Sequence, residues 1–151
     1  MTTRRVDLTV EQAFSIAADV ASYKDFLPLL KRSTIRGERK RVGDTETFDA
    51  DLQVAFEKLG LRETFTSQVT TDANHHSVTA LSSDGPMKAL KAVWNINSTE
   101  DGKSDVTITV DYTMKNMMLQ MMAGGLTDFA AKKIMQAFED RGNVLYGKAL
   151  S

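Results

Sequence analysis

The chain has 151 residues, of which 42% are hydrophobic and 26% charged, a composition typical of one globular domain and unlike that of a disordered segment. Its 19 basic and 20 acidic residues give a net charge of -1, so no whole-molecule field attracts nucleic acid, and we expect no DNA partner. Cysteine is absent, which excludes disulfides, thiolate nucleophiles and thiolate metal sites.

No segment has the hydropathy of a membrane anchor. The first residues lack the apolar run of a secretory signal, and no stretch approaches the roughly 18 apolar residues that span a bilayer. We therefore expect a cytoplasmic protein whose contact with the inner membrane, if it has one, is peripheral.

The first part of the chain predicts one strand and two short helices. Residues 2–8 alternate as a strand does. Thr9 and Gln12 form the pattern of a capping box, and apolar residues follow at helical spacing as far as Ala21. A shorter second helix should end near Leu27, because Pro28 disfavours helical geometry in the residue before it.

The middle of the chain predicts one strand after another. Apolar and polar residues alternate from Phe48 to Phe56, as in a sheet with one dry and one wet face. Further strands are predicted over residues 61–70, 77–82, 90–97 and 106–114, with a weaker signal for an edge strand over 31–41.

After Met114 the apolar spacing becomes helical. One stripe runs from Leu126 to Leu145, long enough for about six turns. A sheet with one apolar face needs a cover, and this helix is the obvious candidate. The order of elements predicts an α+β fold.

Four short segments resemble a known family. They are Asp25-Phe26-Leu27-Pro28, Leu61-Arg62-Glu63 with Phe65, Asp84-Gly85-Pro86 with Trp94, and Ala137-Phe138-Glu139 with Arg141. With the order of elements, they resemble the helix-grip fold of the START and polyketide-cyclase superfamily, which is also that of the birch-pollen allergen. Within it, the chain resembles the coenzyme Q-binding proteins, a subfamily that includes bacterial ribosome-association toxins.

This resemblance implies a curved antiparallel sheet of about six to seven strands around the C-terminal helix, in one START-like lipid- or quinone-binding domain over residues 1–151. It implies a carrier or chaperone, not an enzyme, that holds a polyprenyl quinone such as ubiquinone, or another lipid, in a hydrophobic cavity and supports cellular respiration. The alternative is a toxin-type protein that binds the large ribosomal subunit and blocks subunit joining. A cyclase is disfavoured, because beyond Glu63 no acid/base set is evident.

No catalytic residue, metal ligand or cofactor is expected besides the lipid ligand itself. The predicted ligand-binding residues are Phe26, Leu27, Val54, Phe56, Glu63, Phe65, Met87, Trp94, Met114, Met118, Met122, Phe129 and Arg141.

Five of the eight methionines lie between Met114 and Met122. Flexible, polarizable thioethers suit a surface that adapts to an irregular apolar partner, although they also fill ordinary gaps in a core. Gly124-Gly125 follows at once, which is consistent with a hinged lid or with a simple helix break.

Two charged residues interrupt apolar patterns. Glu63 shares a strand face with Leu61 and Phe65, and Arg141 lies in the stripe of the long helix. A buried carboxylate must be paired or neutralised, so we expect these two residues to form a buried or rim ion pair. The alternatives for Glu63 are a polar anchor for a quinone head group and a general acid/base role.

Two remaining features are polar. Adjacent His75 and His76 follow a turn pattern and indicate a solvated hairpin tip. Six cations between Lys31 and Arg41 form a solvated face, or else a contact for an anionic membrane or for ribosomal RNA.

Overall fold

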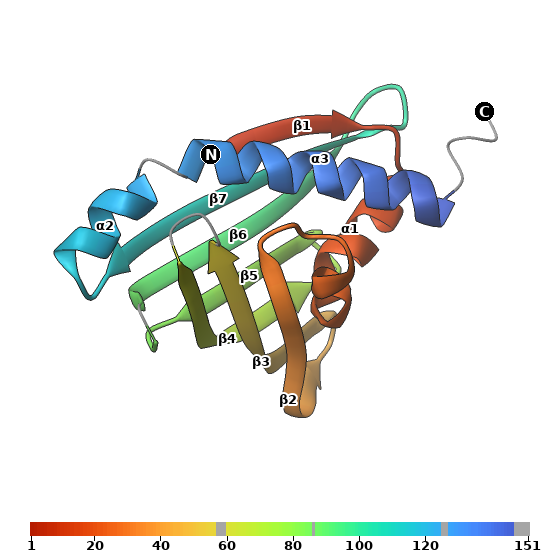
Figure 1. The fold of residues 1–151 in the computed structure, drawn as a ribbon. Coiled ribbons are helices and arrows are strands. Elements are labelled where there is room, and N and C mark those ends of the chain that lie inside the picture. The colour runs from red at the N-terminus through yellow and green to blue at the C-terminus, as the bar shows by residue number, and fades with distance from the viewer. Residues whose placement is uncertain (57–59, 86, 125–126, 147–151) are drawn as a thin grey trace.

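The computed structural model describes residues 1–56, 60–85, 87–124 and 127–146; within these ranges the side chains of residues 56, 61, 87, 119, 122–124 and 127–129 are not described. Figure 1 shows a strongly curved sheet with one long helix lying across it. The strands form one seven-stranded antiparallel sheet in the order β1-β7-β6-β5-β4-β3-β2. The strands are β1 (Thr2–Val6), β2 (Leu30–Val42), β3 (Thr45–Phe56), β4 (Leu61–Asp72), β5 (Ser77–Ser82), β6 (Met87–Ser98) and β7 (Ser104–Met114).

The helices are α1 (Val10–Ala18), the 3-10 helix η1 (Val20–Asp25), α2 (Met117–Gly124) and α3 (Thr127–Tyr146). The predicted capping box begins α1: the Gln12 N–H donates to Thr9 Oγ1 at 3.2 Å, and the Thr9 N–H donates to Gln12 Oε1 at 3.0 Å. The second predicted helix is this 3-10 turn, and it ends earlier than expected, at Asp25.

The predicted strands are all present, and the weakly signalled one is β2, at one edge of the sheet. The sheet has long strands on either side of a short β5, and a single long helix lies across it. This arrangement is an α+β helix-grip fold, as the sequence predicts.

The packed core lies where α1 and the C-terminal half of α3 cover the sheet. The rings of Trp94 and Phe138 stack with centroids 5.3 Å apart. Helix α3 closely approaches the segment between β1 and α1 at Gly142, where a Cβ would come within 2.6 Å of the Leu8 side chain. A larger residue there would require the Leu8 side chain to move.

Candidate functional site

The sheet face that carries Trp94 and Val106 is apolar and turned toward α3, and we call it the inner face. Near α1 its side chains are closely packed; Val106, Ile96 and Val78 are at most 2% exposed. Nearer α2 the same face is only half-buried. We call these half-buried residues the open wall: Leu52, Val54, Ala80, Leu90, Ala92, Val110, Tyr112 and Met114.

Strand pairing brings the open wall together. Ala92 pairs with Val110 on β7 and with Ala80 on β5, and Leu90 pairs with Tyr112. Leu27 and Ile134, from outside the sheet, are also apolar, half-buried and packed against the core. Because these carbons face the helix side yet stay partly accessible, the described side chains leave part of this half of the inner face uncovered, unlike the half near α1.

The predicted ligand-binding residues divide between the two halves. Phe26, Val54 and Met114 are half-buried, as a lining requires, whereas Phe65 and Trp94 are each 5% exposed. Trp94 packs in the core through its stack on Phe138. The side chains of Phe56, Met87, Met122 and Phe129 lie outside the described part, so their role and the volume of the predicted cavity stay predictions.

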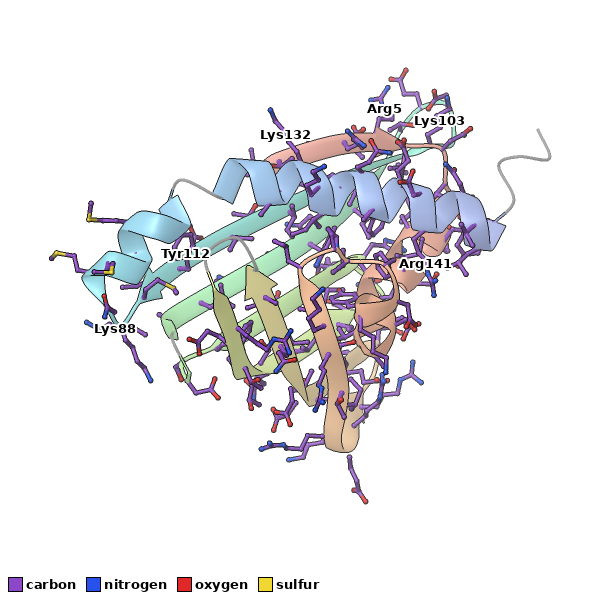
Figure 2. All side chains as sticks on the ribbon, in the orientation of Figure 1. Arg5, Lys88, Lys103, Tyr112, Lys132 and Arg141 are labelled. Atoms are coloured by element: carbon purple, nitrogen blue, oxygen red, sulfur yellow. The ribbon has the colours of Figure 1, made fainter. Side chains whose placement is uncertain are left out.

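Glu63 is half-buried on the inward-facing side of β4, as its alternation predicts. The expected ion pair with Arg141 is wrong: none of the ion pairs among the described side chains joins the two, and the Arg141 guanidinium carbon lies 5.4 Å from the centre of the Phe26 ring. The two residues lie on different parts of the fold: Glu63 is the third residue of β4, whereas Arg141 lies in the last turns of α3, at the end of that helix away from α2 (Figure 2).

The methionines of α2 face solvent. Met117, Met118 and Met121 are 81%, 70% and 76% exposed, so the expectation that Met118 lines the interior is wrong in this conformation. Met114, on β7, is the described member of the cluster that belongs to the open wall. Helical spacing alone could not tell which side of α2 turns outward, because both sides carry methionines.

A pair of buried hydroxyls on the inner face was not predicted. The Ser67 and Ser82 hydroxyls are hydrogen-bonded to each other, and both residues are at most 7% exposed. One of these hydroxyls donates to the other, which leaves one O–H available to an acceptor. The sequence signal was a serine between Phe65 and Val69, where alternation places an apolar side chain.

The core holds a second buried hydroxyl, that of Tyr23, which donates to the carbonyl oxygen of Ala17. Burial raises the pKa of Tyr23, so this group stays neutral and does not act as an acid or base at ordinary pH. Its role is to fix η1 against α1.

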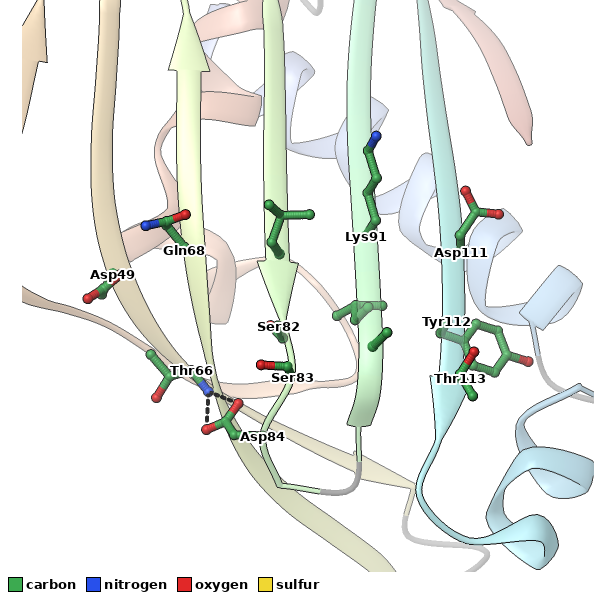
Figure 3. A pocket seen from close by; sticks show the side chains of 13 residues that line it. Asp49, Thr66, Gln68, Ser82, Ser83, Asp84, Lys91, Asp111, Tyr112 and Thr113 are labelled. Carbon is green, nitrogen blue, oxygen red and sulfur yellow. Dashed lines mark hydrogen bonds between the residues drawn. The ribbon is translucent and has the colours of Figure 1, made fainter.

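A groove of about 810 Å³ lies mainly on the opposite, outer face of the sheet (Figure 3). Asp49, Lys91 and Asp111 line it, together with Asp84, whose carboxylate accepts from the Thr66 N–H at 3.0 and 3.1 Å. The Asp84 carboxylate thereby satisfies a backbone N–H of β4 beyond Gln68, where the pairing of β4 with the short β5 ends. A groove with these carboxylates does not suit an apolar ligand.

The edge strand β2 carries the basic segment. Arg36 binds Asp51 at 2.9 Å, and Arg39 binds Glu46 at 2.7 Å. Arg32, Lys40 and Arg41 are exposed and form no ion pair with another described residue. These three cations are therefore available to an anionic partner.

The histidine pair lies at a hairpin tip, as predicted, but only His75 is exposed there, and His76 is half-buried. His75 Nδ1 lies 2.7 Å from Asp72 Oδ2, and the His76 ring packs against Phe14 in a T-shaped arrangement. Among the described residues, no group of three or more histidine, aspartate or glutamate side chains could hold a metal ion. None of the described helices is both long and apolar enough to span a bilayer.

Several solved structures share this fold. An 18 kDa protein from Caulobacter crescentus superposes with a TM-score of 0.80 at 29% identity, covering 97% of this chain and 96% of that one. The Streptomyces aromatase/cyclase Zhui superposes with a TM-score of 0.83 over 98% of this chain and 94% of that one, at 15% identity, which shows the fold alone.

Curated relatives fall into two groups. Coenzyme Q-binding protein COQ10 homolog B of Xenopus laevis, a mitochondrial protein, is 29% identical over 93% of this chain, which spans 56% of the length of that relative. The ribosome association toxin RatA of Vibrio cholerae is 25% identical over 95% of this chain and 94% of the toxin. The model of one family matches residues 6–139. The chain belongs to this family, described as polyketide cyclase / dehydrase and lipid transport.

Proposed function

We propose that this protein binds an apolar isoprenoid, most favourably the tail of a polyprenyl quinone such as ubiquinone, between the open wall and α3. The observation that carries the proposal is the half-burial of a mainly apolar surface, the open wall, on the helix side of the sheet. The mitochondrial relatives named for coenzyme Q binding support this choice of ligand.

The energy of such binding comes from removing the tail from water. Each buried methylene contributes about 0.8 kcal/mol, so one isoprene unit contributes roughly 3–4 kcal/mol before entropic costs. A few enclosed units are enough for useful affinity, and the rest of a long tail can stay outside.

The hydroxyl pair offers a polar contact for the head group. Ser67 and Ser82 lie on the inner face beside the open wall, and one of their hydroxyl hydrogens can be donated to a quinone carbonyl oxygen. Glu63 is the alternative anchor, since it is half-buried on the same face.

We favour a carrier or chaperone over an enzyme. A cyclase needs acid and base groups around its substrate, whereas the described ionisable side chains of the open wall and its neighbours on β4 are the Tyr112 phenol and the Glu63 carboxylate. Cytoplasmic placement with peripheral membrane contact stays a prediction, and the mitochondrial names of two relatives favour a different compartment for those proteins.

The test is native mass spectrometry of the freshly purified protein, followed by extraction of bound lipid. Val110→Glu places a charge in the open wall and should abolish the bound mass of a quinone. Thr113→Glu makes the same change on the outer face of the same strand and should leave it unchanged. Wild-type protein that carries no lipid, and takes none up from added ubiquinone, would contradict the proposal.

A ribosome-directed function is the second candidate, and the exposed cations of β2 favour it. Reversing Arg32, Lys40 and Arg41 should abolish co-sedimentation with ribosomal subunits, because phosphate contacts are lost when the charge is inverted. The same variant should keep any quinone held in the interior. Ribosome binding by wild type without any lipid would reverse the order of the two candidates.

A further inference from the structure

The exposed methionines of α2 form a surface that neither ligand binding nor the β2 cations explain. We call Met117, Met118 and Met121 the methionine patch. Figure 2 shows sulfur atoms projecting from α2 at the end of the molecule where Lys88 lies. Large apolar side chains gathered on one exposed helix usually mark a docking surface.

Two polar side chains of this region, those of Asn116 and Gln120, are hydrogen-bonded to the backbone. Asn116 Oδ1 accepts from the Met118 N–H at 2.7 Å and caps the helix start, and Gln120 Oε1 accepts from the Met114 N–H at 2.7 Å. These two bonds fix α2 to the end of β7 with the methionine patch outward. They also satisfy backbone donors, which lowers the energy needed to bring this helix into an apolar medium.

The occupant that fits this patch is a lipid bilayer. From Met114 to Thr127 the sequence contains Lys115 and no acidic residue. Lys88 lies one position beyond the pairing of Met87 with Met114. Both lysines are exposed and form no ion pair with another described residue, so they can face anionic headgroups while the methionines enter the acyl region.

A protein partner fits the patch less well. Binding hot spots between proteins are enriched in Trp, Tyr and Arg, and residues 114–127 contain none of these. Flexible thioethers adapt to irregular apolar partners, and the acyl region of a bilayer is one of these.

We infer that the methionine patch docks this protein on an anionic lipid surface, with the open wall near the bilayer. The inference rests on the proposed function for the reason why the protein docks: an isoprenoid tail could then pass between the membrane and the inner face. Docking itself requires no bound quinone, so the two can be tested apart.

Flotation with quinone-free vesicles of phosphatidylcholine and phosphatidylglycerol tests the inference. Replacing the three methionines by glutamine should lower the vesicle partition coefficient by roughly tenfold or more, because their apolar surface no longer enters the bilayer. The control Val144→Gln with Leu145→Gln removes exposed apolar surface at the far end of α3 and should change nothing. Replacing Lys88 and Lys115 by glutamine should weaken binding to anionic vesicles roughly fivefold per lysine.

A tryptophan reporter locates the contact. The chain has one tryptophan, so Met118→Trp in a Trp94→Phe background gives one reporter on the patch, and Val144→Trp in that background gives the control. Lipids brominated on their acyl chains should quench the fluorescence of the tryptophan at position 118 and leave that of the tryptophan at position 144 unchanged. Equal quenching of both, or wild-type protein that does not float while it retains quinone, would overturn the inference and leave the proposed function standing. A dimer in light scattering that the methionine-to-glutamine variant dissociates would identify the patch as a self-association surface instead.

Discussion

Replacing one alanine by leucine in each half of the inner face should show, through protein stability, which half is fully packed and which has space. Ala50 is fully buried on β3, and Ala92 is half-buried in the open wall on β6. Ala50→Leu forces extra carbons into a filled core and should lower the free energy of unfolding by about 1–3 kcal/mol. Ala92→Leu places the same carbons where space remains, and its added apolar contact should contribute up to about 2 kcal/mol.

The free energies of unfolding of the two variants should therefore differ by about 1–5 kcal/mol in urea denaturation. For a domain of this size the difference corresponds to about 3–15 °C in Tm. The reasoning also predicts that Ala92→Leu reduces quinone uptake, because the leucine occupies the space of the tail. Equal destabilisation by both substitutions would refute it, since the wall around Ala92 would then be as tightly packed as the core.

Two further predictions concern the turn and strand beside the outer groove. Gly85 has φ +59° and a Cβ there would lie 2.7 Å from the Thr64 carbonyl oxygen, so Gly85→Ala should lower Tm more than Gly102→Ala, where φ is +80° but the space is open. Thr66→Val removes the hydrogen bond that contributes most to the lowered pKa of Asp51. That pKa lies below its ordinary value of 3.8 in the folded protein, so the stabilisation is present above that value and lost as pH falls through the folded pKa. In urea denaturation, the free energy of unfolding of Thr66→Val should therefore fall further below that of wild type near pH 6 than near pH 2. A difference in this free energy that does not change with pH would contradict the assignment.

The sequence predicted the fold closely because local and long-range signals agreed. The capping box of Thr9 fixed the start of α1, and strict alternation in β3 and β7 identified the inner face. The edge strand β2 gave a weak signal because most of its residues are exposed, so burial imposes little alternation on it.

Side-chain partners were predicted less well, because periodicity assigns a face but no position along it. Alternation correctly placed the Glu63 side chain on the inner face. It could not show that the Arg141 guanidinium lies over the Phe26 ring, away from Glu63. The buried contact of Ser67 with Ser82 depends on which strands pair, and that is a property of the folded sheet.

The central claim is that the ligand lies on the inner face, and methyl NMR tests it most directly. A short-tailed ubiquinone is titrated into the protein while the methyl signals of Ala92, Val110 and Leu52 are compared with those of Leu81, which is exposed on the outer face and lines the polar groove. The account predicts saturable shifts of the three open-wall methyls with Leu81 unchanged. Shifts at Leu81 without shifts in the open wall would contradict it.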